Sequence, residues 1–262
     1  AFALGAATAS PQDHAGVIGL REDYLSAAHW IAQVSDPDRV ILDRAGIAAQ
    51  NARMRQLDAS IHDLRALPAT LPRDFVRAQI EAISRPPTRT LYDVQGKPVD
   101  AAQLRAISDN LAMDRIAGTR PLQYGLVVHR AALRAFPTGL RVFSSSGDTD
   151  IDRFQESALF PGDKVAVVHR SADGRWLFVH SERYSAWIEA DAIASGDKAT
   201  VLGYGAKGSY RIITGATAQT AYTPEEPRVS RLQLDMGVRL PLLADWPASE
   251  PVNGQQAHAS WV

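Results

Sequence analysis

The spacing of apolar residues divides the chain into a helical first part and a β-rich second part. From Arg21 to about Leu122, apolar residues recur at three- and four-residue intervals, the spacing that stacks side chains on one face of a helix. The most regular segment is Arg44 to Leu67, and Pro68 and Pro72 are expected to end it. Its expected face consists of Ile47, Asn51, Met54, Leu57, Ile61 and Leu64.

Shorter helices are expected on either side of this segment, each introduced by an aspartate. Asp23 precedes an expected helix through Ile31, and the turn-forming cluster Ser35 to Asp38 is expected to end this helix. Asp74 precedes an apolar pattern through Ile83, and Asp100 one through Leu111. A carboxylate at the start of a helix accepts hydrogen bonds from unpaired backbone N–H groups, so each aspartate is a candidate N-cap.

After Pro121 the pattern becomes that of short strands. β-branched and aromatic runs alternate with Gly, Pro, Asp and Ser, and Asp173-Gly174 is typical of a tight hairpin turn. Several short strands without a long helix between them predict a small β-barrel from Leu126 to Ala194. The expected strands are 126–128, 133–136, 165–168 and 176–179.

A second group of strands is expected after a glycine-rich linker at 203–208. The chain finishes on Ala259-Ser260-Trp261-Val262, which resembles the start of a strand, so the second group is expected to be an incomplete barrel. The expected strands are 211–214, 221–222, 232–234 and 238–243.

Composition restricts the possible functions. The chain has 262 residues, a hydrophobic share of 45% and a formal net charge of −1, which fits two or three small folded domains. Lys and Arg form no run, so binding to nucleic acid is not expected. No stretch approaches the roughly 18 apolar residues of a membrane span. Ala1 to Ala9 is either a signal-peptide remnant or a disordered tail.

Candidate chemical motifs are incomplete. Asp148, Asp150 and Asp152 alternate like a calcium loop, but Arg153 replaces the turn glycine and Leu159 the bidentate glutamate. The histidines lack zinc-site spacing, and Ser144 to Gly147 lacks the nucleophile elbow. The chain contains no cysteine, which excludes a thiol nucleophile. We expect no catalytic residue, no metal and no cofactor.

Three segments together resemble a known family. They are Asp152 to Gln155, His169 to Trp176 and Tyr184 to Ile188, which are similar to the D-x-x-Q, S-x-D-G-x-W and Y-x-G-W-[VI] motifs of the first bacterial SH3-like domain in NlpC-type cell-wall cysteine peptidases. Ala186 stands where the family has glycine. The segment Asp38 to Asp43, with Ile47 and Asn51, resembles the family's helical "clip", and Leu234 to Leu240 and Ser260 to Val262 resemble its second SH3-like domain.

The resemblance covers about residues 21–262 and implies an α+β fold. The expected order is a tail at 1–20, a helical clip subdomain at 21–122, a first SH3-like barrel at 123–200 and a second, truncated SH3-like barrel at 209–262. The family's C-terminal papain-like domain, which carries the catalytic cysteine and histidine, is not in this chain.

The resemblance also implies a function. The chain would be the non-catalytic region of a periplasmic or secreted γ-D-glutamyl-L-diamino-acid endopeptidase, and its partners would be peptidoglycan stem peptides and the papain-like domain. Asp152 would bind an ammonium group, Arg153 a carboxylate and Gln155 an amide, with the Tyr184 hydroxyl at the rim of the groove.

Several alternatives stay open. The Asp152 loop could be an ordinary solvated loop, and Tyr184 and Trp187 could belong to the barrel core. The protein could also be a free-standing SH3-like cell-wall-binding or scaffold protein without a peptidase. Recognition of proline-rich segments is less favoured, because no aromatic-lined groove is evident.

Overall fold

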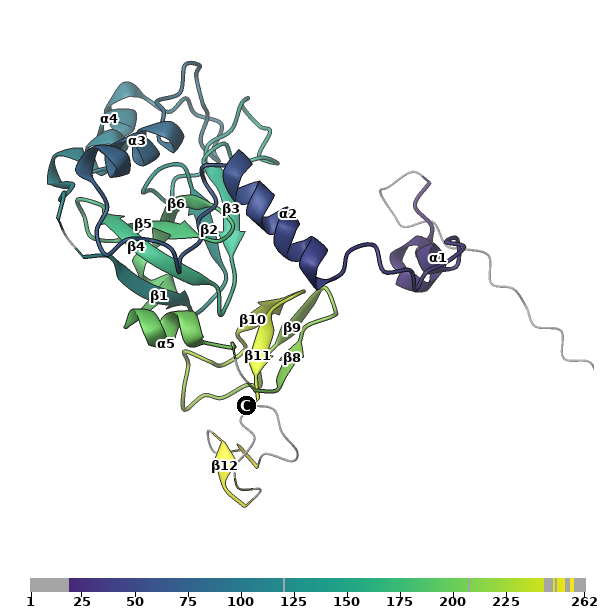
Figure 1. The fold of residues 1–262 in the computed structure, drawn as a ribbon. Helices are drawn as coiled ribbons and strands as arrows, with labels where there is room; N and C mark the ends of the chain where they lie inside the picture. The colour runs from purple at the N-terminus through teal and green to yellow at the C-terminus, as the bar shows by residue number, and fades with distance from the viewer. Residues whose placement is uncertain are drawn as a thin grey trace, which may run out of the picture. The chain divides into compact units, whose positions relative to one another are not determined.

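The computed structural model describes residues 19–119, 121–206, 208–242, 247, 249–252 and 255–256. Two segments of the sequence analysis lie outside the described residues: the signal-peptide or tail segment Ala1 to Ala9, and the expected strand start Ala259 to Val262. The chain divides into two compact units, residues 1–53 and 54–262, which are described separately (Figure 1).

The first unit begins with two short helical pieces. The 3-10 helix η1 (Glu22–Leu25) is followed by α1 (Ala27–Ile31). The predicted cap at Asp23 is wrong, because Arg21 occupies the N-cap position without a side-chain bond. The Asp23 carboxylate instead accepts hydrogen bonds of 2.9 and 2.8 Å from the Arg21 guanidinium and pairs with His29 at 2.9 Å.

Helix α2 (Arg44–Leu57) ends ten residues earlier than the apolar spacing predicts. Asp58 accepts hydrogen bonds from the backbone N–H and the hydroxyl of Ser60, at 2.8 and 2.7 Å. Such a local turn competes with helical hydrogen bonding. The expected apolar face is also wrong, because α2 contains no buried residue and Leu57 is 69% exposed, whereas Leu64 in the following loop is fully buried.

The second unit contains two longer helices, α3 (Arg73–Ile83) and α4 (Ala101–Asp109), and the short η2 (Met113–Arg115). Pro72, not Asp74, is the N-cap of α3, and Asp74 lies in the first turn, where the helix dipole favours a carboxylate. The predicted cap at Asp100 is confirmed. Its side chain accepts from Gln103 N at 2.8 Å, and Gln103 Oε1 accepts from Asp100 N at 2.9 Å.

A seven-stranded antiparallel sheet with the order β3-β2-β6-β5-β4-β1-β7 forms the centre of this unit. The predicted α+β class and the β-rich region near 126–194 are confirmed, and Gly174 has a φ of 73° in the hairpin turn before β5. The strands are β1 (Gln123–Val127), β2 (Ala131–Arg134), β3 (Gln155–Leu159), β4 (Lys164–Arg170), β5 (Trp176–Ser181), β6 (Ser185–Glu189) and β7 (Ile193–Gly196).

One core cluster lies between this sheet and the helices, and a second is formed mainly by the strands themselves. In Figure 1, α3 and α4 lie together on one side of the sheet. Trp187 and Phe178 are fully buried, and they share one apolar cluster with Val76 and Ile80 of α3. Trp187 Nε1 donates to Ser84 Oγ at 3.1 Å, and this hydroxyl donates to Ala135 O at 2.6 Å. Trp187 is therefore confirmed as a core residue that ties α3 to the sheet.

The region after the seven-stranded sheet contains short elements. The described pairs are β9 with β10, β8 with β11 and β12 with β13. Residues 221–222 are not a strand, contrary to expectation, whereas the other three predicted segments each overlap one. A second barrel and the domain limits remain predictions. The elements are η3 (Ala190–Ala192), α5 (Lys198–Gly203), β8 (Tyr210–Ile212), β9 (Thr217–Gln219), β10 (Gln233–Asp235), β11 (Arg239–Pro241), β12 (Pro251–Val252) and β13 (Gln255–Gln256).

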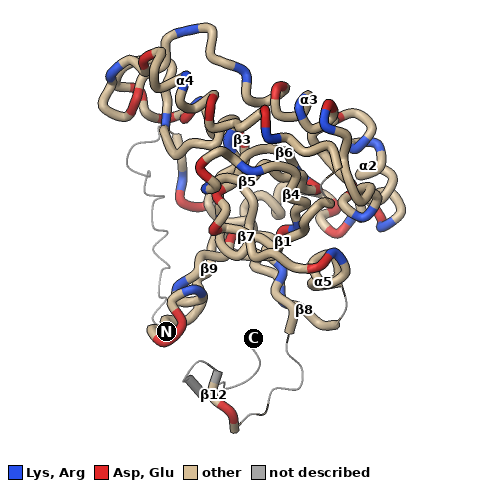
Figure 2. The backbone as a smooth tube through the Cα atoms, turned by 90° about the vertical axis from the view of Figure 1, so that its left-hand side faces the viewer, with Lys and Arg blue, Asp and Glu red and all other residues tan. Residues whose placement is uncertain are grey.

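Charged residues of both signs are interspersed along the described chain, as Figure 2 shows. None of the described helices is long and apolar enough to cross a membrane.

Candidate functional site

Asp152 is an internal support of the loop before β3. Its Oδ2 pairs with Arg134 Nη1 at 2.9 Å, and the two side chains are only 8% and 6% exposed. Its Oδ1 accepts from the backbone N–H groups of Val142 and Phe154, at 3.2 and 3.0 Å. Because both oxygens are occupied by the protein, the carboxylate fixes the loop against β2.

Arg153 and Gln155 lie on the exposed side of the same loop. Arg153 Nε donates to Ser144 Oγ at 2.6 Å, while its backbone N–H donates to Val142 O at 2.7 Å. Gln155 begins β3, and its amide group donates to Ser157 O at 2.5 Å. Both side chains are exposed, and within the described residues their hydrogen bonds go to neighbours no more than nine positions away in the sequence. A ligand could therefore replace these contacts at little cost.

Tyr184 directly precedes β6 and combines the two roles that the sequence left open. Its ring is partly buried against the sheet core, and its hydroxyl donates to Glu156 Oε2 at 3.0 Å. Its backbone N–H donates to Ser181 Oγ at 2.9 Å, which fixes the position of the ring. Burial, followed by the bond to Glu156, raises the pKa of Tyr184 to about 12. The hydroxyl therefore stays protonated near neutral pH.

Glu156 is the residue that sequence reasoning missed. It is exposed on β3, directly after Gln155, and its carboxylate receives the Tyr184 hydroxyl from 28 positions away in the sequence. A strand prediction over 155–159 would have drawn attention to it, but this short segment has too little apolar character. Among the described residues, no hydrogen bond joins Tyr184 to Asp152, Arg153 or Gln155.

The aspartates of the calcium-like motif point to different partners. Asp148 Oδ1 accepts from Asp150 N at 3.2 Å, a local turn, while Asp152 is directed inward to Arg134. In the described part of the chain, no three His, Cys, Asp or Glu side chains are grouped as metal ligands.

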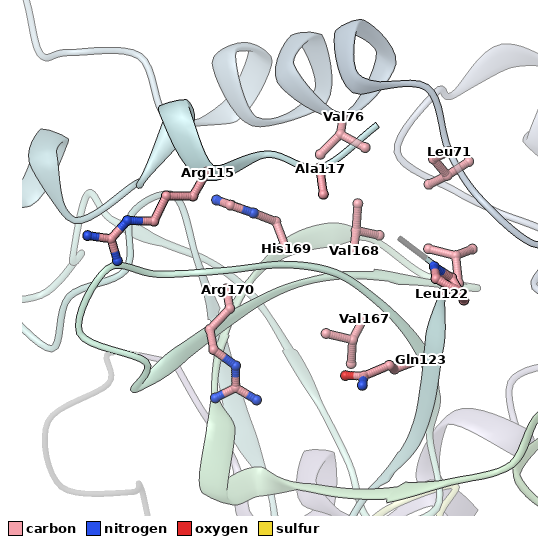
Figure 3. A pocket seen from close by; sticks show the side chains of 11 residues that line it. Leu71, Val76, Arg115, Ala117, Leu122, Gln123, Val167, Val168, His169 and Arg170 are labelled. Carbon is pink, nitrogen blue, oxygen red and sulfur yellow. The ribbon is translucent and has the colours of Figure 1, made fainter. Parts of the chain in front are cut away.

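A small cavity lies elsewhere, on the side of β4 that faces α3 (Figure 3). Its volume of about 40 Å³ suits a few water molecules, not a peptide. Figure 3 shows the guanidinium groups of Arg115 and Arg170 pointing away from Val76. His169 is committed to the main chain, since its Nε2 lies 3.0 Å from Leu111 O. Of the residues described above, Arg153, Gln155 and Glu156 are exposed and Tyr184 is partly exposed, and we call these four residues the rim.

This rim belongs to a recognised domain. Residues 141–189 match the family model described as SH3 domain (SH3b1 type), and the match includes every residue of the rim. The chain therefore carries a domain of the SH3b1 type. The sheet described above supplies its strands β3 to β6.

The fold of the larger part of the chain is similar to that of a solved enzyme. An NlpC/P60 endopeptidase from Photobacterium damselae subsp. piscicida superposes with a TM-score of 0.58 and 19% identity, over 78% of this chain and 48% of that one. The chain thus spans about half the length of this relative. A search of curated proteins finds no match. The predicted resemblance to the NlpC-type family with SH3 domains is confirmed.

Proposed function

We propose that the chain is the non-catalytic region of a peptidoglycan-degrading NlpC-type cysteine endopeptidase, of the γ-D-glutamyl-L-diamino-acid type. Its SH3b1-type domain forms one wall of the substrate groove and binds the murein stem peptide. A periplasmic or secreted location belongs to this proposal. The SH3b1 match and the NlpC/P60 fold likeness support a role at peptidoglycan.

The Glu156–Tyr184 pair is the observation that carries the proposal. A carboxylate beside a protonated phenol offers an acceptor for a ligand ammonium group, and the phenol oxygen offers a second acceptor. The stem peptide has such a group at its free amino end. Charge-assisted hydrogen bonds of this kind are stronger than neutral ones and orient the ligand.

The other rim residues complete the recognition. Arg153 can turn from Ser144 to a ligand carboxylate, and Gln155 can exchange its bond to Ser157 O for a ligand amide. Asp152 contributes by positioning, because its bond to Arg134 fixes the backbone that carries both side chains. Cleavage is left to the papain-like domain, since this chain has no cysteine.

Titration of the chain with murein stem peptides tests the proposal. A peptide with a free L-Ala amine should bind at least about tenfold more tightly than its N-acetylated form, because only the free form brings a cation to Glu156. Glu156→Gln should remove this preference, whereas Glu81→Gln, at an exposed site on α3, should retain it.

Equal affinity of the wild-type chain for the free and blocked peptides would contradict the proposal. Binding to intact peptidoglycan without any dependence on the free amine would favour the free-standing cell-wall-binding role instead.

A further inference from the structure

A fully buried histidine, His180, and a partly buried one, His62, are stacked on each other although they come from distant parts of the second unit. His62, in the loop after α2, lies on His180 of β5, with ring centroids 3.9 Å apart and an interplanar angle of 33°. The His62 backbone N–H donates to Ser181 O at 3.2 Å. The loop that follows α2 is thereby attached to the β5–β6 hairpin.

A chain of hydrogen bonds defines the protonation of His180. Ser185 Oγ donates its only hydrogen to Ser60 O at 2.9 Å, because a carbonyl can only accept. The same hydroxyl lies 2.9 Å from His180 Nδ1 and must accept there. His180 is therefore the neutral tautomer with its hydrogen on Nδ1, and its Nε2 is a buried acceptor that has no partner in the described part of the chain.

The surroundings of the pair disfavour a positive charge. His62 Nε2 is also buried without a partner among the described residues. Phe75 of α3 and Phe178 face His180 with ring centroids 6.2 and 6.0 Å away, and Ala166 of β4 lies opposite it in the sheet. The charged or titratable groups that act on the pair are Asp58, near His62, and the two imidazoles themselves.

Burial, and then the neighbouring His62, lowers the pKa of His180 to about 3. Burial also lowers the pKa of His62, which Asp58 only partly opposes. Rings that overlap with centroids 3.9 Å apart and a tilt of 33° do not direct two in-plane lone pairs at one ion, so the pair does not fit a metal site.

We propose that the His62–His180 stack is an acid-sensitive latch, which fastens residues 58–62 to β5 and β6 when both imidazoles are neutral and releases them when the imidazoles become protonated. Protonation places two cations at stacking distance in an apolar site and can be relieved only by moving His62 into water. Ser185, which the latch ties to Ser60, directly follows Tyr184, so release also frees one side of the β6 start. The latch does not depend on the identity of the ligand.

The sign of the pH effect follows from the lowered pKa values. A released histidine has its usual pKa near 6.5 and takes up a proton more readily than the buried one. The latch is therefore fully closed above about pH 6.5 and weakens as the pH falls toward 3. Protonation of His180 favours release by up to about tenfold per pH unit within that range, and protonation of His62 acts in the same direction.

Amide hydrogen exchange of the full chain tests the latch, together with NMR titration of the histidine ring protons. Between pH 6.5 and 4.5, the protection factor of the His62 amide should fall about 50-fold if His180 titrates alone, and further if His62 titrates as well. The Ala135 amide, which donates to Phe154 O at 2.9 Å next to the paired ends of β2 and β3, should stay protected. The double variant H62F/H180F keeps two stacked rings that cannot be protonated, and it should keep its residue-62 amide protected at pH 4.5. His129→Gln, at a partly exposed histidine outside the stack, should behave like the wild type.

Three results would overturn the latch. One is a ring pKa near 6.5 for both His62 and His180 in the folded chain. Another is simultaneous loss of protection at His62 and Ala135, which would indicate global acid unfolding. The third is no loss of protection at His62 down to pH 4. These wild-type measurements decide the matter even if the double variant fails to fold.

Discussion

The segment from η1 to α2 and the strands β5 and β6 are both rich in apolar residues, but these residues are largely exposed in the first region and buried in the second. No residue of η1, α1 or α2 is buried, and Trp30 is 53% exposed. In β5 every residue is buried, and Trp187 of β6 is fully buried. Isolated helices shorter than about 12 to 15 residues are only marginally stable, so an apolar stripe needs a packing partner before it forms a core.

The largest difference should appear between the two tryptophans. Trp187→Ala removes a fully buried ring and its bond to Ser84 Oγ, and should lower the free energy of unfolding by about 4 kcal/mol. Trp30→Ala should change it by less than about 0.5 kcal/mol, because its ring contacts are with Tyr24 and His29 of the same short segment. Urea denaturation followed by circular dichroism measures both changes. Equal effects would show that the two tryptophans contribute equally to stability, contrary to the difference in their burial.

A closer comparison uses two leucines of one predicted apolar face. Leu64→Ala should cost about 3 kcal/mol, because Leu64 is fully buried with Tyr124, Ala166 and Val201. Leu57→Ala, at a residue that is 69% exposed, should cost less than about 0.5 kcal/mol. The urea midpoints of the two variants measure these costs. A large effect at Leu57 would support the predicted apolar face that includes both leucines.

The smallest effect is expected at the helix starts. Asp100→Ala removes a capping box and should lower the free energy of unfolding by about 1 kcal/mol. Asp23→Ala should leave it unchanged within error, because the exposed pair with Arg21 is screened by solvent. Thermal denaturation at low and high salt separates the two cases, since a cap is less sensitive to salt than an exposed ion pair.

Much of the fold could be predicted from short-range chemistry. The capping box at Asp100, the hairpin at Asp173-Gly174 and the strands around 165–168 and 176–179 depend on residues within a few positions of one another. The three motifs assigned to the first SH3-like domain likewise lie in the segment that matches the SH3b1 domain. These predictions succeeded because backbone geometry and local hydrogen bonds act over one turn or one hairpin.

The candidate site depended on contacts that no local pattern contains. The motif around Asp152 suggested that its carboxylate binds a ligand. In the structure this carboxylate is paired with Arg134, which lies 18 positions away in the sequence. Glu156 became a candidate only because its carboxylate accepts a hydrogen bond from Tyr184, 28 positions along the chain. The sheet brings the two residues together through strands that are not consecutive in sequence.

The same distinction separates Leu57 from Leu64 and explains the histidine stack. Sequence periodicity shows which apolar residues share a direction, and it correctly indicated helices followed by a β-rich region. Only the assembled sheet decided which of those residues are buried and which polar groups lose water, because burial requires a partner surface from elsewhere in the chain. Side chains lose water where such surfaces meet. For His62 and His180, this loss of water lowers the pKa of both imidazoles.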